Sequence, residues 1–353
     1  MPKSKHPEKP PLPRLARIVK SFSGRRLGVL GDWMLDRYVW GKATRLSPEA
    51  AVPVVDFEKE DSTLGGAGNV AANLVALGAS VFPFGASGKD VAADSLRNLV
   101  RKLDMSEKGI VEDSARMTTI KTRIIARHQQ IVRVDRETRA PLRPEMEEIL
   151  IRRAMAVLPT LHALVLSDYD KGVVTDELAA RVLGACAKLG IKSFIKPKWS
   201  MLATYPGATV IVLNRGEAGF LVSRALDDDA SVEQAAAQLL EKFKSSAVII
   251  TRGEKGMSVL EQDAAKAVHI PATRQEPSVG RLGQRAKHPP GKQVFDLTGA
   301  GDTVLATLAL AVSAGASLCN AAVLANAAAG VVGGKLGTAT VSPAELLAAL
   351  RDL

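Results

Sequence analysis

Between residues 144 and 260, short apolar segments alternate with helical segments, and this alternation restricts the possible folds more than any other feature. The apolar segments, at 163–168, 192–195, 209–213 and 247–251, are rich in Val, Ile and Leu. Helices are expected over about 144–157, 175–189 and 231–243. Such alternation is typical of a mainly parallel sheet with helices on both faces. We therefore predict an α/β fold.

The first half of the chain adds strands at 26–32 and 81–85, a helix that opens with residues 65–69 and a helix from about Ala92. Two extended stretches, 37–60 and 117–135, do not fit the alternation. We expect them to pair as a small separate β-sheet that acts as a lid. Ligands of parallel sheets bind beyond the carboxyl ends of the strands. The polar residues expected at this edge are Asp32, Asp168, Asn214 and Thr251.

With 353 residues, 46% of them hydrophobic, the chain can bury a large core. We expect a basic, Pro-rich and disordered tail over 1–23 and one domain over 24–353, with a basic insertion at 274–292. The net charge is +10, and most of it lies in the tail and the insertion. This placement favours solvated peripheral charge over a nucleic-acid-binding surface, so no nucleic acid is expected as a partner.

No apolar run is long enough to span a membrane, and the basic N-terminus lacks the apolar region of a secretory signal. Cys186 and Cys319 are isolated in Ala-rich helical segments, as expected of core residues in a reducing compartment. We therefore expect a cytoplasmic protein with no membrane partner.

A Gly-Ala-Gly-Asp turn, formed by residues 299–302, precedes an apolar helix. Backbone N–H groups at such a helix start can hold an anion, and the small residues allow it to approach closely. Asp302 could then accept a proton from a hydroxyl beside that anion, an arrangement that suits phosphoryl transfer. Taken alone, the motif also fits a tight turn in which Asp302 only complements the helix dipole. The sequence contains neither a P-loop nor a complete dinucleotide-binding motif.

Seven segments together resemble the ribokinase-like (PfkB) family of carbohydrate kinases, and within it the bacterial heptose 7-phosphate kinases. They are GDWMLDRYVWG, RLSPEAAVPVV, LGGAGNVAANLVALGA, KTRIIARHQQIVRVDRE, LSDYDKGV, DLTGAGDTV and ANAAAGVVGGKLGTATVSP. The resemblance covers about residues 24–353 and implies a three-layer α/β/α fold with a small β lid. In many bacteria such a kinase is fused to a nucleotidyltransferase; only the kinase-like region is present in this sequence, so only the kinase step is expected.

The resemblance implies ATP-dependent phosphorylation of the anomeric hydroxyl of a heptose 7-phosphate, in the synthesis of lipopolysaccharide precursors. Asp302 would be the base, and Gly299, Ala300 and Gly301 would form the anion hole. Asn214 and Glu217 match an Asn-x-x-Glu motif that positions Mg²⁺ and the nucleotide phosphates. The other residues implied at the ATP site are Lys198, Thr251, Gly253 and Asn326. Those implied for the sugar hydroxyls are Asp32, Gly65, Gly66 and Asn69.

The distal phosphate of such a sugar needs cations, and the candidates are Lys121, Arg123, Arg127, Arg133 and Lys171. Exposed lid strands would favour a homodimer through edge pairing. One departure concerns Lys196, which stands where these heptose kinases usually have Asp. It leaves open a different sugar kinase of the family, or a catalytically weak, regulatory protein that binds sugar phosphates.

Overall fold

The central sheet holds the strands that the alternation predicted. The computed structural model describes residues 11–126, 129–197, 205, 207–273, 299–335 and 337–351. Within them, a nine-stranded sheet has the order β13-β12-β11-β10-β9-β8-β1-β4-β5. Its strands are β1 (Arg26–Gly31), β4 (Ser80–Ser87), β5 (Ile110–Glu112), β8 (Ala163–Ser167), β9 (Lys192–Lys196), β10 (Val210–Asn214), β11 (Ala247–Thr251), β12 (Met257–Glu261) and β13 (Val268–Ile270). The pairs from β5 to β11 are parallel, whereas β12 and β13 are added antiparallel.

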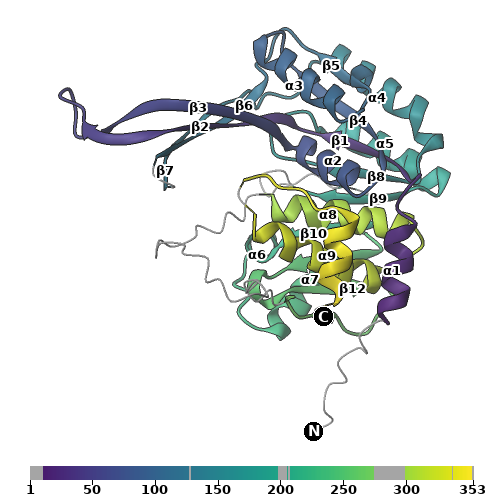
Figure 1. The fold of residues 1–353 in the computed structure, drawn as a ribbon. Coiled ribbons are helices and arrows are strands. Elements are labelled where there is room, and N and C mark those ends of the chain that lie inside the picture. Colours follow the sequence, from purple (N-terminus) through teal and green to yellow (C-terminus); the bar gives the residue numbers. More distant parts are fainter. Residues whose placement is uncertain are drawn as a thin grey trace, which may run out of the picture.

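Helices cover both faces of this sheet (Figure 1). One face packs against α1 (Leu12–Lys20), α2 (Ala67–Ala76), α3 (Val91–Lys102), α8 (Ala300–Ser313), α9 (Leu318–Gly333) and α10 (Pro343–Arg351). The other packs against α4 (Pro144–Val157), α5 (Asp176–Leu189), α6 (Arg215–Leu221) and α7 (Asp229–Phe243). In the described residues, short 3₁₀ turns lie at Glu107–Gly109, Leu158–Thr160 and Gly253–Lys255. The three-layer α/β/α prediction is confirmed.

The continuous apolar runs of the strands follow from this double covering. In β8, Ala163 and Val165 belong to the core on the α8 face, whereas Leu164 and Leu166 belong to the core on the α5 face. Successive side chains of a strand point to opposite faces, so a strand buried on both sides needs an apolar residue at every position. The α/β prediction succeeded because these runs contain few polar residues.

A second sheet projects from the body of the molecule (Figure 1). It has the order β3-β2-β6-β7, with strands β2 (Trp33–Leu46), β3 (Pro53–Gly66), β6 (Thr119–Ala126) and β7 (Gln129–Arg136). Strand β2 pairs parallel with β6, and the other two pairs are antiparallel. The small separate sheet expected from 37–60 and 117–135 is therefore present. It reaches closer to the central sheet than predicted, because β2 follows β1 after the single residue Asp32.

The prediction of a disordered tail over 1–23 is wrong for its second half. Residues 12–20 form α1, and Leu15, Val19 and Phe22 are almost completely buried. Leu15 and Val19 lie four residues apart, so they share one face of a helix between basic residues, a pattern that the tail's composition concealed. Residues 1–10 and the basic insertion at 274–292 lie outside the described residues.

Candidate active site

Polar residues gather at the carboxyl edge of the central sheet. Asp32 and Asp168 follow β1 and β8, and Lys196, Asn214 and Thr251 end β9, β10 and β11. The strand register places Ser167 opposite both Gly31 and Lys196, and Asn214 opposite Thr251. The edge predicted from the sequence therefore exists, and it contains Lys196 as well.

The helix α8 begins at this edge with bare backbone. Its N-cap residue, Gly299, has a φ of +90° and no side-chain cap. A Cβ on Gly299 would lie 2.7 Å from Asn69 Nδ2, and a Cβ on Gly301 would lie 3.2 Å from Lys196 Nζ. Only glycine combines this conformation with such close approach. The first-turn N–H groups of α8 thus lie beside side chains from α2 and β9, where an anion can be bound.

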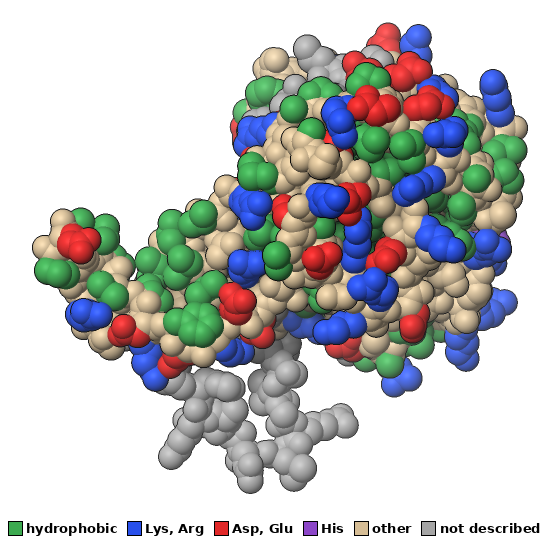
Figure 2. Space-filling view, turned by 90° about the horizontal axis from the view of Figure 1, so that it is seen from above, with side chains coloured by type: hydrophobic (Ala, Val, Ile, Leu, Met, Phe, Trp, Pro, Cys, Tyr) green, Lys and Arg blue, Asp and Glu red, His purple; other side chains and the backbone are tan. Residues whose placement is uncertain are grey.

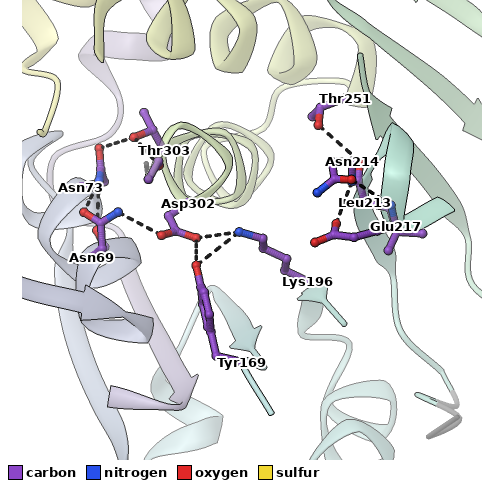
Figure 3. A network of polar contacts seen from close by, with 11 residues as sticks. Asn69, Asn73, Tyr169, Lys196, Leu213, Asn214, Glu217, Thr251, Asp302 and Thr303 are labelled. Carbon is purple, nitrogen blue, oxygen red and sulfur yellow. Dashed lines mark hydrogen bonds and ion pairs between the residues drawn. The ribbon is translucent and has the colours of Figure 1, made fainter. Parts of the chain in front are cut away.

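Asp302 lies in the first turn of α8 and is only 3% exposed. Its Oδ2 accepts a hydrogen bond of 2.9 Å from Asn69 Nδ2. Its Oδ1 accepts one of 2.5 Å from Tyr169 Oη and one of 2.9 Å from Lys196 Nζ (Figure 3). A carboxylate offers about four lone-pair positions, so these three bonds leave one, on Oδ2. Asp302 can therefore accept one more hydrogen bond, from a hydroxyl on the side of Asn69.

Tyr169 and Lys196 keep their protons at this site. Burial, followed by the charge of Asp302, raises the pKa of the Tyr169 phenol, which therefore acts as a donor. Burial alone would lower the pKa of Lys196, but the Asp302 carboxylate outweighs it and the pKa is raised. The Lys196 ammonium also lies 3.3 Å from Tyr169 Oη. Lys196 is consequently a cation at neutral pH.

Tyr169 and Asn73 contribute to this network but were absent from the predicted site. Tyr169 belongs to the LSDYDKGV segment and follows a strand end by two residues, which is the signal that could have identified it. Asn73 lies one turn after Asn69 on α2 and donates to the backbone oxygen of Asn69 at 2.9 Å. Lys196 was recognised from the sequence only as a departure from the family pattern.

Asn214 and Glu217 form a reciprocal cap at the start of α6. Glu217 N donates to Asn214 Oδ1, and Asn214 N donates to Glu217 Oε2, both at 2.8 Å. The cap leaves Glu217 Oε1, which points toward Lys196 and Asp302 in Figure 3. Mg²⁺ often binds through one or two carboxylates, water and substrate phosphates, and one carboxylate oxygen fits such a role. Among the described residues, no group of three or more His, Cys, Asp or Glu residues could hold a metal ion by itself.

The remaining residues expected at the ATP site lie on neighbouring elements. Thr251 Oγ1 donates to Leu213 O at 3.4 Å, which connects β11 to β10. Gly253 has a φ of +60° and open space where a side chain would be. Asn326 on α9 donates to Pro271 O at 2.7 Å and to Thr273 Oγ1 at 3.2 Å. Lys198 lies outside the described residues.

Asp32 holds the loop that carries Tyr169. Its carboxylate accepts hydrogen bonds from the backbone N–H groups of Tyr169, Lys171 and Val173 at 2.7, 3.2 and 3.2 Å. Burial and the nearby Asp168 raise the pKa of Asp32 to about 7, although these three bonds oppose the increase. The Asp32 carboxylate therefore already binds three backbone N–H groups, in addition to any sugar hydroxyl that it would contact.

Gly65 and Gly66 bring the end of β3 against two acidic residues. A Cβ on Gly65 would lie 2.3 Å from Asp36 Oδ2, and one on Gly66 would lie 2.5 Å from the backbone oxygen of Asp32. Gly66 has a φ of +57° and is the N-cap of α2, which carries Asn69. The two glycines therefore allow the helix of Asn69 to start beside Asp32.

Lys121 lies within electrostatic reach of two other predicted cations, Lys171 and Arg133. Burial lowers the pKa of Lys121, Asp36 opposes this, and the charges of Lys171 and Arg133 lower it further. Lys121 Nζ lies 5.3 Å from the centre of the Tyr169 ring, and Lys171 pairs with Glu137 at 2.9 Å. Arg133 pairs with Asp135 on the exposed strand β7.

The other two candidate cations differ in position. Arg123 is 7% exposed and pairs with the buried Asp36 inside the second sheet. Arg127 lies outside the described residues.

Solved structures resemble this fold over most of the chain. Phosphofructokinase-2 from Escherichia coli, in complex with substrates and products, has a TM-score of 0.71 at 19% identity, covering 93% of this chain and 98% of that one. A ribokinase of Arabidopsis thaliana, complexed with ribose and ATP, has a TM-score of 0.69 at 17% identity, covering 93% and 99%. At this level of identity the likeness establishes the ribokinase-like fold alone.

Curated relatives are much closer in sequence. The bifunctional protein HldE of Geobacter sulfurreducens is 44% identical over 322 residues, which cover 91% of this chain and 62% of that protein. HldE of Desulfatibacillum aliphaticivorans is 41% identical over 334 residues, which cover 95% and 65%. The chain thus spans somewhat less than two thirds of the length of these relatives.

None of the helices in the described residues has both the length and the apolar character that crossing a membrane requires.

The model of the pfkB family carbohydrate kinases matches residues 26–345, a range that includes the strand-end residues, α8 and the second sheet. The chain therefore belongs to the pfkB family of carbohydrate kinases and is a sugar kinase.

Proposed function

We propose that this protein transfers the γ-phosphoryl group of ATP to the anomeric hydroxyl of a heptose 7-phosphate. The main support is the surroundings of Asp302, a buried carboxylate with one lone pair left, located at an uncapped helix start. A sugar hydroxyl bound to Oδ2 would lie beside the N–H groups that stabilise the transferred phosphoryl. Asp302 would then accept the hydroxyl proton as the oxygen attacks phosphorus.

The choice of a phosphorylated sugar rests on the cations near Tyr169. The Tyr169 ring has Lys196 at 5.2 Å and Lys121 at 5.3 Å from its centre. Lys121 lies within electrostatic reach of Lys171 and Arg133, which pair with Glu137 and Asp135. The positive charge of the three cations suits the distal phosphate of a heptose 7-phosphate. The resemblance of the seven sequence segments to heptose 7-phosphate kinases favours this sugar over other sugar phosphates.

The nucleotide would lie on the side of β10, β11 and α9. Asn214 and Glu217 would position its phosphates with Mg²⁺, which would offset the charge of the phosphate oxygens. Thr251, Gly253, Asn326 and Lys198 remain the residues proposed for the nucleotide. Asp32, Gly65, Gly66 and Asn69 remain those proposed for the sugar, with Asp32 acting through the loop that it holds.

We also propose that two copies associate through the second sheet, as expected from its exposed strands. Every residue of β7 is exposed, and hydrophobic side chains gather along the projecting sheet (Figure 2). The exposed large apolar residues of this sheet and its β2–β3 turn include Leu46, Val52, Phe57, Ile131, Val132 and Val134. Pairing two such sheets would cover these side chains.

The protein would act in the cytoplasm, because the proposed reaction consumes ATP and a sugar phosphate.

An ADP-release assay with Mg²⁺-ATP tests the proposed activity. Heptose 7-phosphate is compared with ribose, fructose 6-phosphate and no sugar. Turnover is expected with the heptose phosphate and not with the other two sugars. Equal or better turnover with another sugar would contradict the proposed substrate. Binding of heptose phosphate without turnover would favour a regulatory protein that binds sugar phosphates. The observation that favours this alternative is the ion pair between Lys196 and Asp302, the proposed base.

A further inference from the structure

Lys196 occupies the space between the two halves of the proposed site. Its ammonium nitrogen lies 2.9 Å from Asp302 Oδ1 and 3.3 Å from Tyr169 Oη. On its other side are Asn214 and Glu217, and the charge of Glu217 contributes to the attraction that Lys196 experiences (Figure 3). The side chain is 19% exposed, so it reaches the surface that substrates would contact.

The donor left on the ammonium group distinguishes Lys196 from a simple counter-ion of Asp302. An ammonium has three N–H donors, of which Asp302 and Tyr169 use two. Among the described residues, the third donor has no acceptor. The nitrogen also lies 3.2 Å from the position of a Cβ on Gly301, beside the uncapped first turn of α8. The ammonium nitrogen thus lies close to the first turn of α8 and keeps one donor for a ligand bound there.

We propose that Lys196 is a catalytic residue that binds a non-bridging oxygen of the transferred phosphoryl group. This inference rests on the proposed kinase function and deepens it. A fixed positive charge at this point stabilises the phosphoryl oxygens in the transition state, in a largely buried site where water screens little. It also explains how this chain tolerates Lys at a strand end that faces phosphates: the positive charge assists the chemistry.

The proposed step conserves atoms and charge. The sugar hydroxyl oxygen forms a bond to the γ-phosphorus of ATP, and the bond from that phosphorus to the β–γ bridging oxygen breaks. ADP leaves with the electron pair of that bond, and the hydroxyl proton passes to Asp302. Lys196 remains protonated throughout and donates hydrogen bonds to the phosphoryl group and to Asp302. Its raised pKa is consistent with this constant charge.

Binding of ADP with aluminium fluoride, which imitates the transferred phosphoryl, tests this role in the presence of the sugar. The wild type is expected to bind this combination more tightly than ADP alone. Lys196→Met should lose about a hundredfold in that affinity and in kcat, while its affinity for ADP alone is kept. Lys192→Met is the matched control, because Lys192 lies at the exposed opposite end of β9. Thermal unfolding of both variants verifies that they are folded.

A second comparison separates phosphoryl binding from neutralisation of Asp302. In an Asp302→Asn background, Lys196→Met should still weaken aluminium fluoride binding. If Lys196 only neutralised Asp302, the substitution would have no effect there, and the proposed role would be overturned. Wild-type affinity in Lys196→Met would also overturn it, without affecting the proposed function.

Turnover of the wild type with a different sugar would contradict the proposed substrate, and Lys196 is then tested with that sugar. Failure of aluminium fluoride to tighten ADP binding to the wild type with any sugar would overturn the role of Lys196 directly.

Discussion

Thr303 Oγ1 donates a hydrogen bond of 2.9 Å to Asn73 Oδ1, which joins the first turn of α8 to α2. Both side chains are completely buried. Asn73 Nδ2 in turn contacts Asn69 O and Oδ1, and Asn69 Nδ2 contacts Asp302. These hydrogen bonds run from Thr303 on α8 to Asn73 and Asn69 on α2 and back to Asp302 on α8. They therefore fix the position of the proposed base.

Thr303→Val should weaken this chain. It leaves a buried amide oxygen of Asn73 unsatisfied, so we expect a loss of about 1–3 kcal/mol in the free energy of unfolding. Thr307→Val is the control one turn later on α8. The Thr307 hydroxyl is buried and has no hydrogen-bond partner among the described residues, so its loss should be neutral or stabilising. Urea unfolding of both variants checks this, and equal losses would contradict it.

Asp302→Asn should reduce kcat at least about a hundredfold, because an amide cannot accept the hydroxyl proton. The affinity for the sugar should change little, since Asn69 and the cations near Tyr169 remain. Single-turnover kinetics and calorimetric sugar binding measure the two quantities. Unchanged turnover would exclude Asp302 as the base.

Asp32 should make the stability depend on pH. Its pKa is raised to about 7 in the folded protein from an ordinary value of 3.8. Between these values the folded state binds more protons than the unfolded state, so the unfolding free energy falls as the pH rises from about 4 to 7. Asp32→Asn should be less stable but should lack this contribution. The free energy of unfolding of the wild type and of Asp32→Asn is measured at pH 4.5 and at pH 7.5. An identical change with pH in the two proteins would argue against a raised pKa of Asp32.

Lys121→Met should raise the KM for the phosphorylated sugar about tenfold or more, because a partly buried cation near the distal phosphate is lost. The kcat at saturation should change little. Lys42→Met serves as the control: Lys42 lies on the same sheet, but is 67% exposed and pairs with Glu58. Steady-state kinetics with both variants decide whether the distal phosphate lies near Lys121.

Val134→Asp should prevent the proposed association of two copies, since it places a charge in the apolar surface of the second sheet. Val134 is 54% exposed. Val91→Asp is the control, because Val91 is 81% exposed but lies on α3, outside that sheet. Sedimentation velocity should show a dimer for the wild type and the control and a monomer for Val134→Asp. A monomeric wild type would contradict the proposal.

The fold could be predicted from the sequence because strands such as β8 are apolar throughout. The helix α1 was missed because its only signal is the pair Leu15 and Val19 within a basic, Pro-rich stretch. At the site, the Gly-Ala-Gly-Asp turn predicted the helix start beside which Asp302 lies. The contacts of Tyr169 and Lys196 with Asp302 could not be predicted from the sequence, because the two residues lie 133 and 106 positions before Asp302 and meet it only through strand order.

The network around Asp302 also has a consequence for the newly made chain. Asn69, Tyr169 and Lys196 are synthesised long before the carboxylate that they bind. Until α8 emerges from the ribosome, these donors have no acceptor in α8, and burying them without one would be costly. The nascent N-terminal portion should therefore keep this edge of the sheet hydrated and loosely packed, and chaperones and proteases would encounter it in that form.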